Sequence, residues 1–233
     1  GVRECPGPLR LATAGDLEGE AVASEAIACA PALRWIDVAE DAAFAAMDFA
    51  ARGRPDYCWR FLNAWMDATG EHEAAGVLRY ALAYRALVRA QAEYMRGGRC
   101  AQANAYATAA LAWSRPALPR LVIMHGLPGT GKTFESQRLL ERQGALRVRS
   151  DVERKRLFGL GALESSQARG MDIYAGNATA RTYGRLLELA RGILSAGLTA
   201  VIGAAFLMRH GRAAARQLAP EWGVPFGVLP CEG

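Results

Sequence analysis

The sequence predicts an α/β fold in its second half, a parallel sheet with flanking helices, preceded by a mainly α-helical domain. Three observations support this prediction. The run 121–124 is short, continuous and apolar, as is typical of a buried parallel strand, and 199–202 is a second mainly apolar strand candidate. Segments of helical composition follow them, and strands that alternate with helices indicate a parallel sheet with helices on both faces. The 233 residues, 52% of them hydrophobic, suffice for one large domain or two small ones.

The same patterns predict the individual elements. From Trp35 to about Arg96 apolar residues recur at helical spacing, for example at Trp59, Leu62 and Met66. In the second half, further strands are expected at 146–148 and 226–229, and helices from 132 onward, at 173–196 and at 209–218.

A break in the helical pattern separates the two halves. Gly97 and Gly98 interrupt a helical stretch, although residues 101–113 have the composition of one more helix. Pro116 and Pro119 then precede the first predicted strand of the second half. The predicted organisation is a helical domain at 1–96, a linker at 97–119 and an α/β domain at 120–233.

The most specific motif is G-x-x-x-x-G-K-T at residues 126–133, a complete phosphate-binding P-loop. Its glycines allow positive φ, so that successive backbone N–H groups point into one concavity at the positive end of the following helix. The alternative is a chance glycine-rich turn, which the flanking strand and helix disfavour. The residues expected to bind the nucleotide are Gly126, Gly129, Thr130, Gly131, Lys132 and Thr133.

Lys132 and Thr133 have separate expected roles. In such a loop the lysine reaches the β- and γ-phosphates and assists catalysis, while the threonine hydroxyl ligates Mg²⁺. Among the 28 Lys and Arg residues, the lysines are Lys132 and Lys155, which suggests a chemical requirement for lysine at position 132. ATP and Mg²⁺ are therefore the expected cofactors.

Asp151 and Arg154 are the expected partners of this loop. Asp151 ends the second predicted strand of the α/β domain, at the carboxyl edge of the sheet, where ligands bind. A carboxylate there can accept the proton of an attacking hydroxyl. Arg154, one helical turn further, is expected on the same side, where it could hold an anionic or hydroxylated acceptor. Alternatively, and compatibly, Asp151 caps a helix that begins at Val152.

The composition argues against several other classes of protein. The net charge of +5 is spread along the chain, so it favours anionic ligands without indicating nucleic acid. The five cysteines are far apart, so neither a zinc site nor a disulfide framework is expected, and a reducing cytoplasm is the default. No apolar run approaches the roughly 20 residues of a membrane span, and no signal peptide opens the chain. Both ends look like cuts in a longer protein.

On these residues the second half resembles the P-loop kinase family that includes zeta-toxin-like and polynucleotide-kinase-like enzymes, within the AAA family ATPases. The narrowest shared run is R-S-D-V-E-R-K-R at 149–156. Residues 1–96 resemble the C-terminal helical part of an aminoglycoside-phosphotransferase-like domain, on the stretches 33–41, 47–48 with 52–56, and 84–90. The two are fused in a group of bacterial proteins described as bifunctional. The resemblance implies ATP-dependent phosphoryl transfer, with Asp151 and Arg154 in the roles given above.

The second half departs from this kinase family at one strand end. The third strand of the family usually ends in D-A-T-F, where this chain has G-A-A-F at 203–206. Gly203 thus replaces a carboxylate that helps to organise Mg²⁺ or substrate, which is expected to slow transfer more than it weakens nucleotide binding. The lid of the family would follow residue 233. A basic stripe at Arg209, Arg212 and Arg216 either contributes in its place or is a solvated helix face.

The first half departs further from the phosphotransferase family. That family carries H-G-D-L-H-L-G-N, in which Asp is the catalytic base and Asn holds metal, and the matching run here is 6–13. The catalytic Asp corresponds to Pro8 and the Asn to Thr13, while a later metal-binding Asp aligns weakly with Glu25. The resemblance does not extend to the nucleotide-binding lobe of that family. This half is expected to be a catalytically degenerate helical scaffold.

Three functions are consistent with these patterns. The first is an ATP-dependent kinase that phosphorylates a hydroxyl acceptor, with Asp151 as base. The second is a nucleotide-binding module with little or no transferase activity, suggested by Gly203. The third is a polynucleotide 5′-hydroxyl kinase, which rests on fold analogy and modest positive charge. The sequence does not identify the acceptor. His72 is expected on a surface loop.

Overall fold

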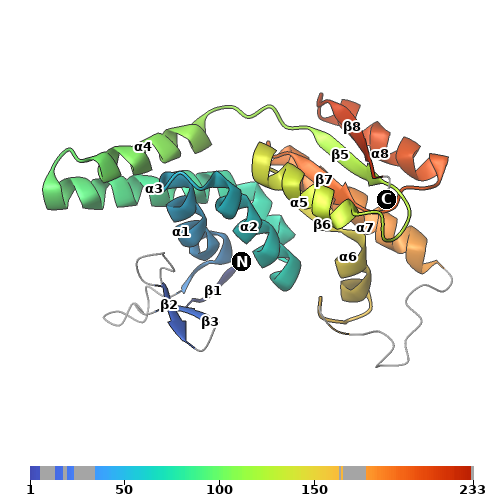
Figure 1. Cartoon of the computed structure of the whole chain (residues 1–233), viewed down its shortest axis with the longest axis horizontal. Coiled ribbons are helices and arrows are strands. Elements are labelled where there is room, and N and C mark those ends of the chain that lie inside the picture. The colour runs from blue at the N-terminus through green and yellow to red at the C-terminus, as the bar shows by residue number, and fades with distance from the viewer. Residues whose placement is uncertain (6–13, 18–19, 24–34, 163, 165–176, 232–233) are drawn as a thin grey trace. The chain divides into compact units, whose positions relative to one another are not determined.

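The computed structural model describes residues 1–5, 14–17, 20–23, 35–162, 164 and 177–231 (Figure 1). The chain forms two compact units. The helical unit comprises Gly1–Leu62 and Ala74–Pro116, and the sheet unit comprises Asn63–Glu73 and Ala117–Gly233. The helix α2 (Pro55–Thr69) therefore contributes its first part to one unit and its last part to the other.

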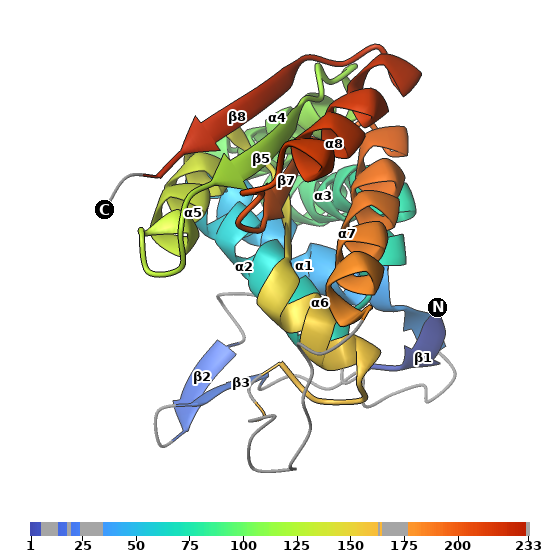
Figure 2. The same cartoon turned by 90° about the vertical axis from the view of Figure 1, so that its right-hand side faces the viewer.

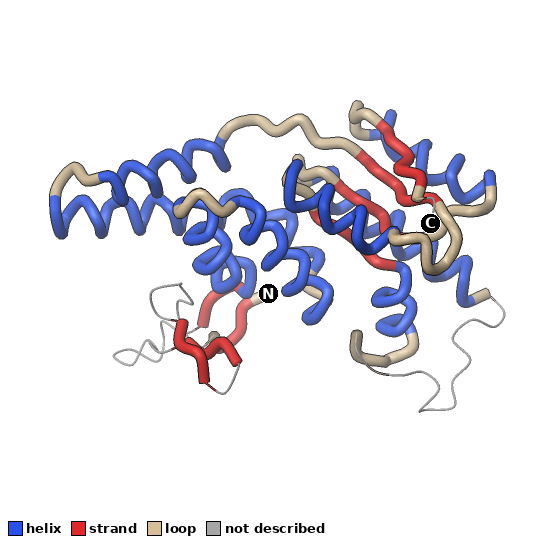
Figure 3. Tube along the Cα trace, viewed as in Figure 1, coloured by secondary structure: helices blue, strands red, loops and turns tan. Residues whose placement is uncertain are grey.

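The helical unit contains short strands and long helices (Figure 3). β1 pairs antiparallel with β4, and β2 pairs antiparallel with β3. The bounds are β1 Val2–Glu4, β2 Ala14–Leu17, β3 Glu20–Ala23, β4 Trp35–Asp37, α1 Val38–Ala51, α3 Ala75–Gly97 and α4 Ala101–Ser114, with a 3₁₀ turn, η2, at His72–Ala74. The segment from Trp35 to Asp37 is thus a strand, whereas its sequence predicted helix.

Small side chains on α1 contribute much of the core of the helical unit. Ala39, Ala43 and Ala46 on α1 have no exposed surface, which allows the neighbouring helix backbones to approach closely. Asp48 is also fully buried, and the hydroxyl of Tyr106 on α4 donates a hydrogen bond to its carboxylate. The helix α4, which lies within the range expected to be a linker, is therefore joined to α1 by a buried polar contact.

The sheet unit is a parallel four-stranded sheet in the order β6-β7-β5-β8. Helix α5 covers one face, and α7 and α8 cover the other (Figure 2). The bounds are β5 Leu121–His125, α5 Lys132–Gln143, β6 Leu146–Arg149, α6 Ser150–Leu157, α7 Ala178–Ser195, β7 Ala200–Gly203, α8 Arg209–Glu221 and β8 Phe226–Pro230. This arrangement confirms the predicted α/β P-loop fold with a mainly helical region before it.

The central strands form because their side chains are buried on both sides. Every side chain of β5 from Leu121 to Met124 is buried, as are Ala200, Val201 and Ile202 of β7. The predicted strands consequently match the observed ones to within one or two residues. One helix end differs, because α8 continues through Pro220 to Glu221. The expected start of α7 at 173 lies outside the described residues.

His72 does not lie on the surface as its sequence context suggested. Its side chain is buried, and its Nε2 lies 4.0 Å from Glu153 Oε1 on α6, within the sheet unit. Among the described residues, no helix has the length and apolar character that a membrane crossing requires.

Candidate functional site

The P-loop joins the end of β5 to the start of α5. Gly126, Gly129 and Gly131 have φ values of 151°, 86° and 78°, a region that favours glycine. At Gly126 space is also restricted, because an added Cβ would lie 2.5 Å from the carbonyl oxygen of Cys231 and 2.7 Å from the hydroxyl of Thr130. The loop therefore needs glycine at its first position for two reasons. The first N–H groups of an α-helix have no partner within the helix, so those of α5 suit a phosphate bound at the loop.

Side chains of the loop hold its own backbone. The hydroxyl of Thr130 donates to the carbonyl oxygen of Leu127 at 2.8 Å. Lys132 Nζ donates to the carbonyl oxygen of Gly126 at 3.0 Å and also to that of Leu127. The ammonium group is thus held against the loop backbone, within reach of a ligand that enters the loop.

A cavity of about 340 Å³ lies over the loop at the carboxyl ends of β5, β6 and β7. We call it the phosphate cavity. Parallel sheets place their ligands at this edge. The cavity brings together the loop, the start of α5 and residues that follow β6 and β7, although they are distant in sequence. Its lining residues are Pro128, Gly129, Gly131, Lys132, Thr133, Ser136, Arg147, Arg149, Ser150, Asp151, Gly203 and Ala205.

Asp151 lines this cavity, as its position at a strand end predicted. Its carboxylate accepts two hydrogen bonds from Arg149, at 2.7 Å from Nη2 and 3.2 Å from Nε. The side chain is 56% exposed, so it remains accessible to an acceptor. Asp151 is not the N-cap of a helix, since α6 begins at Ser150 and its N-cap residue is Arg149. The capping interpretation is therefore wrong.

Arg154 does not share the cavity with Asp151. It is 8% exposed, and its Nη1 donates to the hydroxyl of Thr179 on α7 at 3.3 Å. The reason is that α6 packs against α7, and position 154 faces that helix. Its position does not support the expected role in holding an acceptor. Arg149, to which the sequence reasoning gave no role, is the arginine that lies beside Asp151.

Arg147 is a second arginine that the sequence reasoning missed. It is buried behind the start of α5, where its Nη1 donates to the Thr133 carbonyl oxygen at 3.2 Å and to the Ser136 hydroxyl at 2.9 Å. Burial lowers the pKa of Arg147 below its usual range, and the carboxylate of Asp67 opposes that shift. The guanidinium thus braces the turn that carries the expected Mg²⁺ ligand. The sequence could have indicated both arginines, because the alternation L-R-V-R in β6 puts Arg147 and Arg149 on the same face of the strand.

The end of β7 lies next to the loop. Gly203 lines the cavity with no carboxylate, and Gly126 N donates to the Ala205 carbonyl oxygen at 3.3 Å. Phe206 follows with a φ of 46°, unusual for a residue with a side chain, and it is buried. Its carbonyl oxygen accepts a 2.6 Å hydrogen bond from Arg212, so one member of the predicted basic stripe is engaged with this turn.

A second, more apolar cavity of about 650 Å³ adjoins the first. Ala205 lines both. The second cavity lies between α7, α8 and the turn after β7, and includes the edge-to-face ring pair Tyr183 and Phe206. Its size lies in the range of small-molecule sites, so it could hold the uncharged body of a ligand whose phosphate or hydroxyl reaches the phosphate cavity.

The side chains that line the phosphate cavity fit a Mg²⁺ ion that is held mainly by the phosphates of a bound nucleotide. Within the described ranges, no group of three or more His, Cys, Asp or Glu side chains gathers as a metal site would. A divalent cation would rely on the Thr133 hydroxyl and on phosphate and water oxygens, which are ligands that Mg²⁺ commonly keeps. The run 6–13 and Glu25, where a phosphotransferase-like site was assessed, lie outside the described residues.

Comparison with known proteins agrees with this picture of the sheet unit. Residues 121–232 match the family model of an AAA domain, which indicates a nucleotide-binding, kinase-like P-loop domain there. Uncharacterized proteins of Mycobacterium tuberculosis and Mycobacterium bovis are each 29% identical to this chain over 211 residues. The alignments cover 88% of this chain and 42% of each relative, so the chain spans about two fifths of the length of the curated relatives it matches.

Proposed function

We propose that the sheet unit binds Mg²⁺-ATP and transfers its γ-phosphoryl group to a hydroxyl acceptor. The observation that carries the proposal is a single cavity lined both by the P-loop and by Asp151. A phosphate site alone would support nucleotide binding, whereas an accessible carboxylate in the same cavity adds a base within reach of a reacting hydroxyl.

The loop residues would bind and orient the phosphates. Gly129 and Gly131 line the cavity, where their backbone N–H groups would donate to phosphate oxygens. Lys132 would exchange its carbonyl contacts for the β- and γ-phosphate oxygens. The Thr133 hydroxyl would hold Mg²⁺, which when bound neutralises charge that develops on the phosphates. Arg147 keeps Thr133 in place from behind, through its carbonyl oxygen.

Asp151 would take the proton of the acceptor hydroxyl. As the acceptor oxygen forms its bond to the γ-phosphorus, the bond from phosphorus to the bridging oxygen breaks and ADP leaves with that electron pair. Arg149 holds the Asp151 carboxylate in one orientation through two hydrogen bonds. Since catalysis of this transfer is mainly positioning and charge stabilisation, such a fixed carboxylate is well suited to it.

A nucleotide-binding module with little transferase activity is the second candidate. Gly203 favours it, because the strand end beside the loop offers no carboxylate to the cavity. Both candidates require the P-loop to bind ATP, and they differ only in turnover.

ATP binding is tested by titration calorimetry on the chain with two matched variants. Lys132→Ala should weaken ATP binding at least tenfold, whereas Lys155→Ala, which removes the other lysine of the chain, should not. Lys155 instead donates to the Ala162 carbonyl oxygen and does not line the cavity. Equal affinity of the Lys132→Ala variant and the unmodified chain would refute nucleotide binding at the loop.

Transfer is tested with γ-labelled ATP and a panel of hydroxyl acceptors. Asp151→Asn should keep the ATP affinity but reduce transfer at least a hundredfold, because the amide cannot accept the proton. Binding without transfer to any acceptor would favour the second candidate. Full transfer by the Asp151→Asn variant would show that another group is the base.

A further inference from the structure

A segment far from the P-loop in sequence belongs to the same unit. Residues 63–73, the last part of α2 and the turn after it, group with 117–233, although the AAA domain match begins only at 121. Asn63 fixes this segment to β6, the edge strand of the sheet. Its Nδ2 donates to the Ala145 carbonyl oxygen at 2.8 Å, and its Oδ1 accepts from Arg147 N at 2.6 Å. The side-chain amide of Asn63 thus forms the two hydrogen bonds that a neighbouring strand would otherwise form with the backbone of β6.

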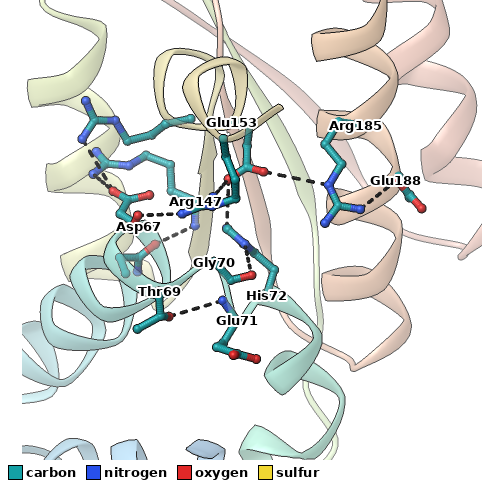
Figure 4. Close-up of polar contacts among 12 residues, drawn as sticks. Asp67, Thr69, Gly70, Glu71, His72, Arg147, Glu153, Arg185 and Glu188 are labelled. Atoms are coloured by element: carbon teal, nitrogen blue, oxygen red, sulfur yellow. Dashed lines mark hydrogen bonds and ion pairs between the residues drawn. The ribbon is translucent and has the colours of Figure 1, made fainter. Parts of the chain in front are cut away.

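One helical turn further, Asp67 contacts both arginines of the phosphate cavity. Asp67 Oδ2 lies 3.5 Å from Arg149 Nη1 and 3.9 Å from Arg147 Nη2 (Figure 4). The Asp67 side chain is 15% exposed and does not line the cavity, whereas both arginines do. The carboxylate therefore contacts both guanidinium groups from outside the set of residues that line the cavity.

Each arginine connects Asp67 to a different functional group. Arg147 reaches the Thr133 carbonyl oxygen, and Arg149 holds the Asp151 carboxylate. Arg156, on α6, anchors the same segment by donating from Nη2 to the Asp67 carbonyl oxygen at 2.8 Å. Asp67 therefore contacts Arg147, which binds the backbone of Thr133, the expected Mg²⁺ ligand. It also contacts Arg149, which binds the carboxylate of the proposed base.

We propose that Asp67 is a positioning residue of the phosphate cavity. It holds Arg147 behind Thr133 and Arg149 beside Asp151, and it reduces the positive charge that the two arginines present to phosphates. Two neighbouring guanidinium groups repel each other, and a carboxylate between them offsets that repulsion while orienting both. The inference rests on the proposed nucleotide site but not on transferase activity.

Its test is ADP binding to the whole chain, with and without Mg²⁺, measured by titration calorimetry. Asp67→Asn removes the charge at nearly constant volume, and Asp67→Glu retains it. Glu73→Gln is the matched control, an exposed carboxylate on the same segment. Denaturant unfolding of each variant checks that the chain is folded.

Two changes are expected, one in the affinity without Mg²⁺ and one in the affinity that Mg²⁺ adds. Without Mg²⁺, Asp67→Asn should bind ADP about threefold to tenfold more tightly, because a negative charge behind the cavity is gone. The factor by which Mg²⁺ increases ADP affinity should fall at least threefold, because Arg147 is no longer held in its contact with Thr133. Asp67→Glu should recover at least half of that Mg²⁺ effect, and Glu73→Gln should match the unmodified chain.

A merely structural role gives a different pattern. If Asp67→Asn weakens ADP binding equally in both conditions, or behaves like Glu73→Gln, the positioning role is refuted. These outcomes are independent of the proposed kinase activity, since none involves an acceptor. Loss of the proposed function would appear instead as ADP binding that is unaffected by Lys132→Ala.

Discussion

The side-chain oxygen of Asn63 accepts a 2.6 Å hydrogen bond from the backbone nitrogen of Arg147, 84 positions later in the chain. The same amide donates to the carbonyl oxygen of Ala145, so it completes the backbone pairing of an edge strand. Asn63 is 3% exposed. Because both partners are buried backbone groups, loss of the amide would leave two polar groups without water or protein to pair with.

Asn63→Ala is therefore expected to lower the free energy of unfolding by about 2–6 kcal/mol, since each of the two unpaired buried groups costs roughly 1–3 kcal/mol. Denaturant titration measures this change. The matched control is Asn104→Ala, which makes the same substitution at an exposed position of α4 and should be nearly neutral. Equal stabilities of the two variants would show that the edge pairing contributes little.

These contacts mark the limit of what the sequence could predict. Strands β5 and β7 were predictable because strands buried on both faces are continuous apolar runs, and the P-loop because its glycine spacing is a local requirement. The sequence could not place Asn63 beside β6, because the pairing depends on packing between distant segments. The same holds for His72, whose burial comes from its contact with α6, and for Arg154, whose direction depends on α7.

Gly126→Ala is expected to reduce ADP affinity at least tenfold. The φ of 151° disfavours a side chain, and the new Cβ would lie 2.5 Å from the backbone oxygen of Cys231, so the first residue of the loop must shift. Calorimetric titration with ADP measures the effect. The control is Gly192→Ala on α7, which has no atom within 4 Å of its added Cβ and should raise stability by up to ~1 kcal/mol. Unaltered affinity in Gly126→Ala would contradict the close approach.

The pH dependence of stability should contain a contribution from His72. Burial lowers the pKa of His72 to about 4, and the nearby cations Arg156 and Arg185 act in the same direction. Its Nε2 lies 4.0 Å from Glu153 Oε1 and has no hydrogen-bond partner among the residues that the structure describes. In the unfolded chain the histidine pKa is about 6.5, so between pH 6.5 and 4 the unfolded state binds a proton that the folded state does not. The free energy of unfolding therefore falls as the pH is lowered through this range.

This loss should reach at most about 3 kcal/mol near pH 4, at 1.36 kcal/mol per pKa unit. Burial raises the pKa of Glu153, which acts in the opposite sense, so the informative quantity is the difference between variants. His72→Asn can keep the contact with the Gly70 carbonyl oxygen without titrating, and should flatten the decline. His210→Asn, at an exposed position, is the matched control. Parallel curves for the unmodified chain and His72→Asn would rule out the His72 contribution.

Gly203→Asp should increase phosphoryl transfer if the sheet unit is a kinase. The position lines the phosphate cavity, and an added Cβ would lie 3.5 Å from the Val148 carbonyl oxygen and 3.7 Å from atoms of Arg147 and Arg149, which are ordinary contacts. The site therefore has room for a side chain. A carboxylate there could hold a water ligand of Mg²⁺ beside Thr133, and we expect at least a tenfold higher rate with acceptor, about 1.4 kcal/mol of barrier.

Gly203→Ala separates the effect of the added volume from the effect of the added charge, because it adds the Cβ without the carboxylate. Gly203→Asp should weaken ADP binding in the absence of Mg²⁺, because it places a negative charge near the phosphates, and should enlarge the affinity gained when Mg²⁺ is added. Gly203→Ala should do neither. If the new carboxylate instead pairs with Arg147 and Arg149, both variants will respond to Mg²⁺ alike and transfer will not rise. That result would mean that Arg147 and Arg149 neutralise a carboxylate at position 203, so that its absence does not explain a low rate of transfer.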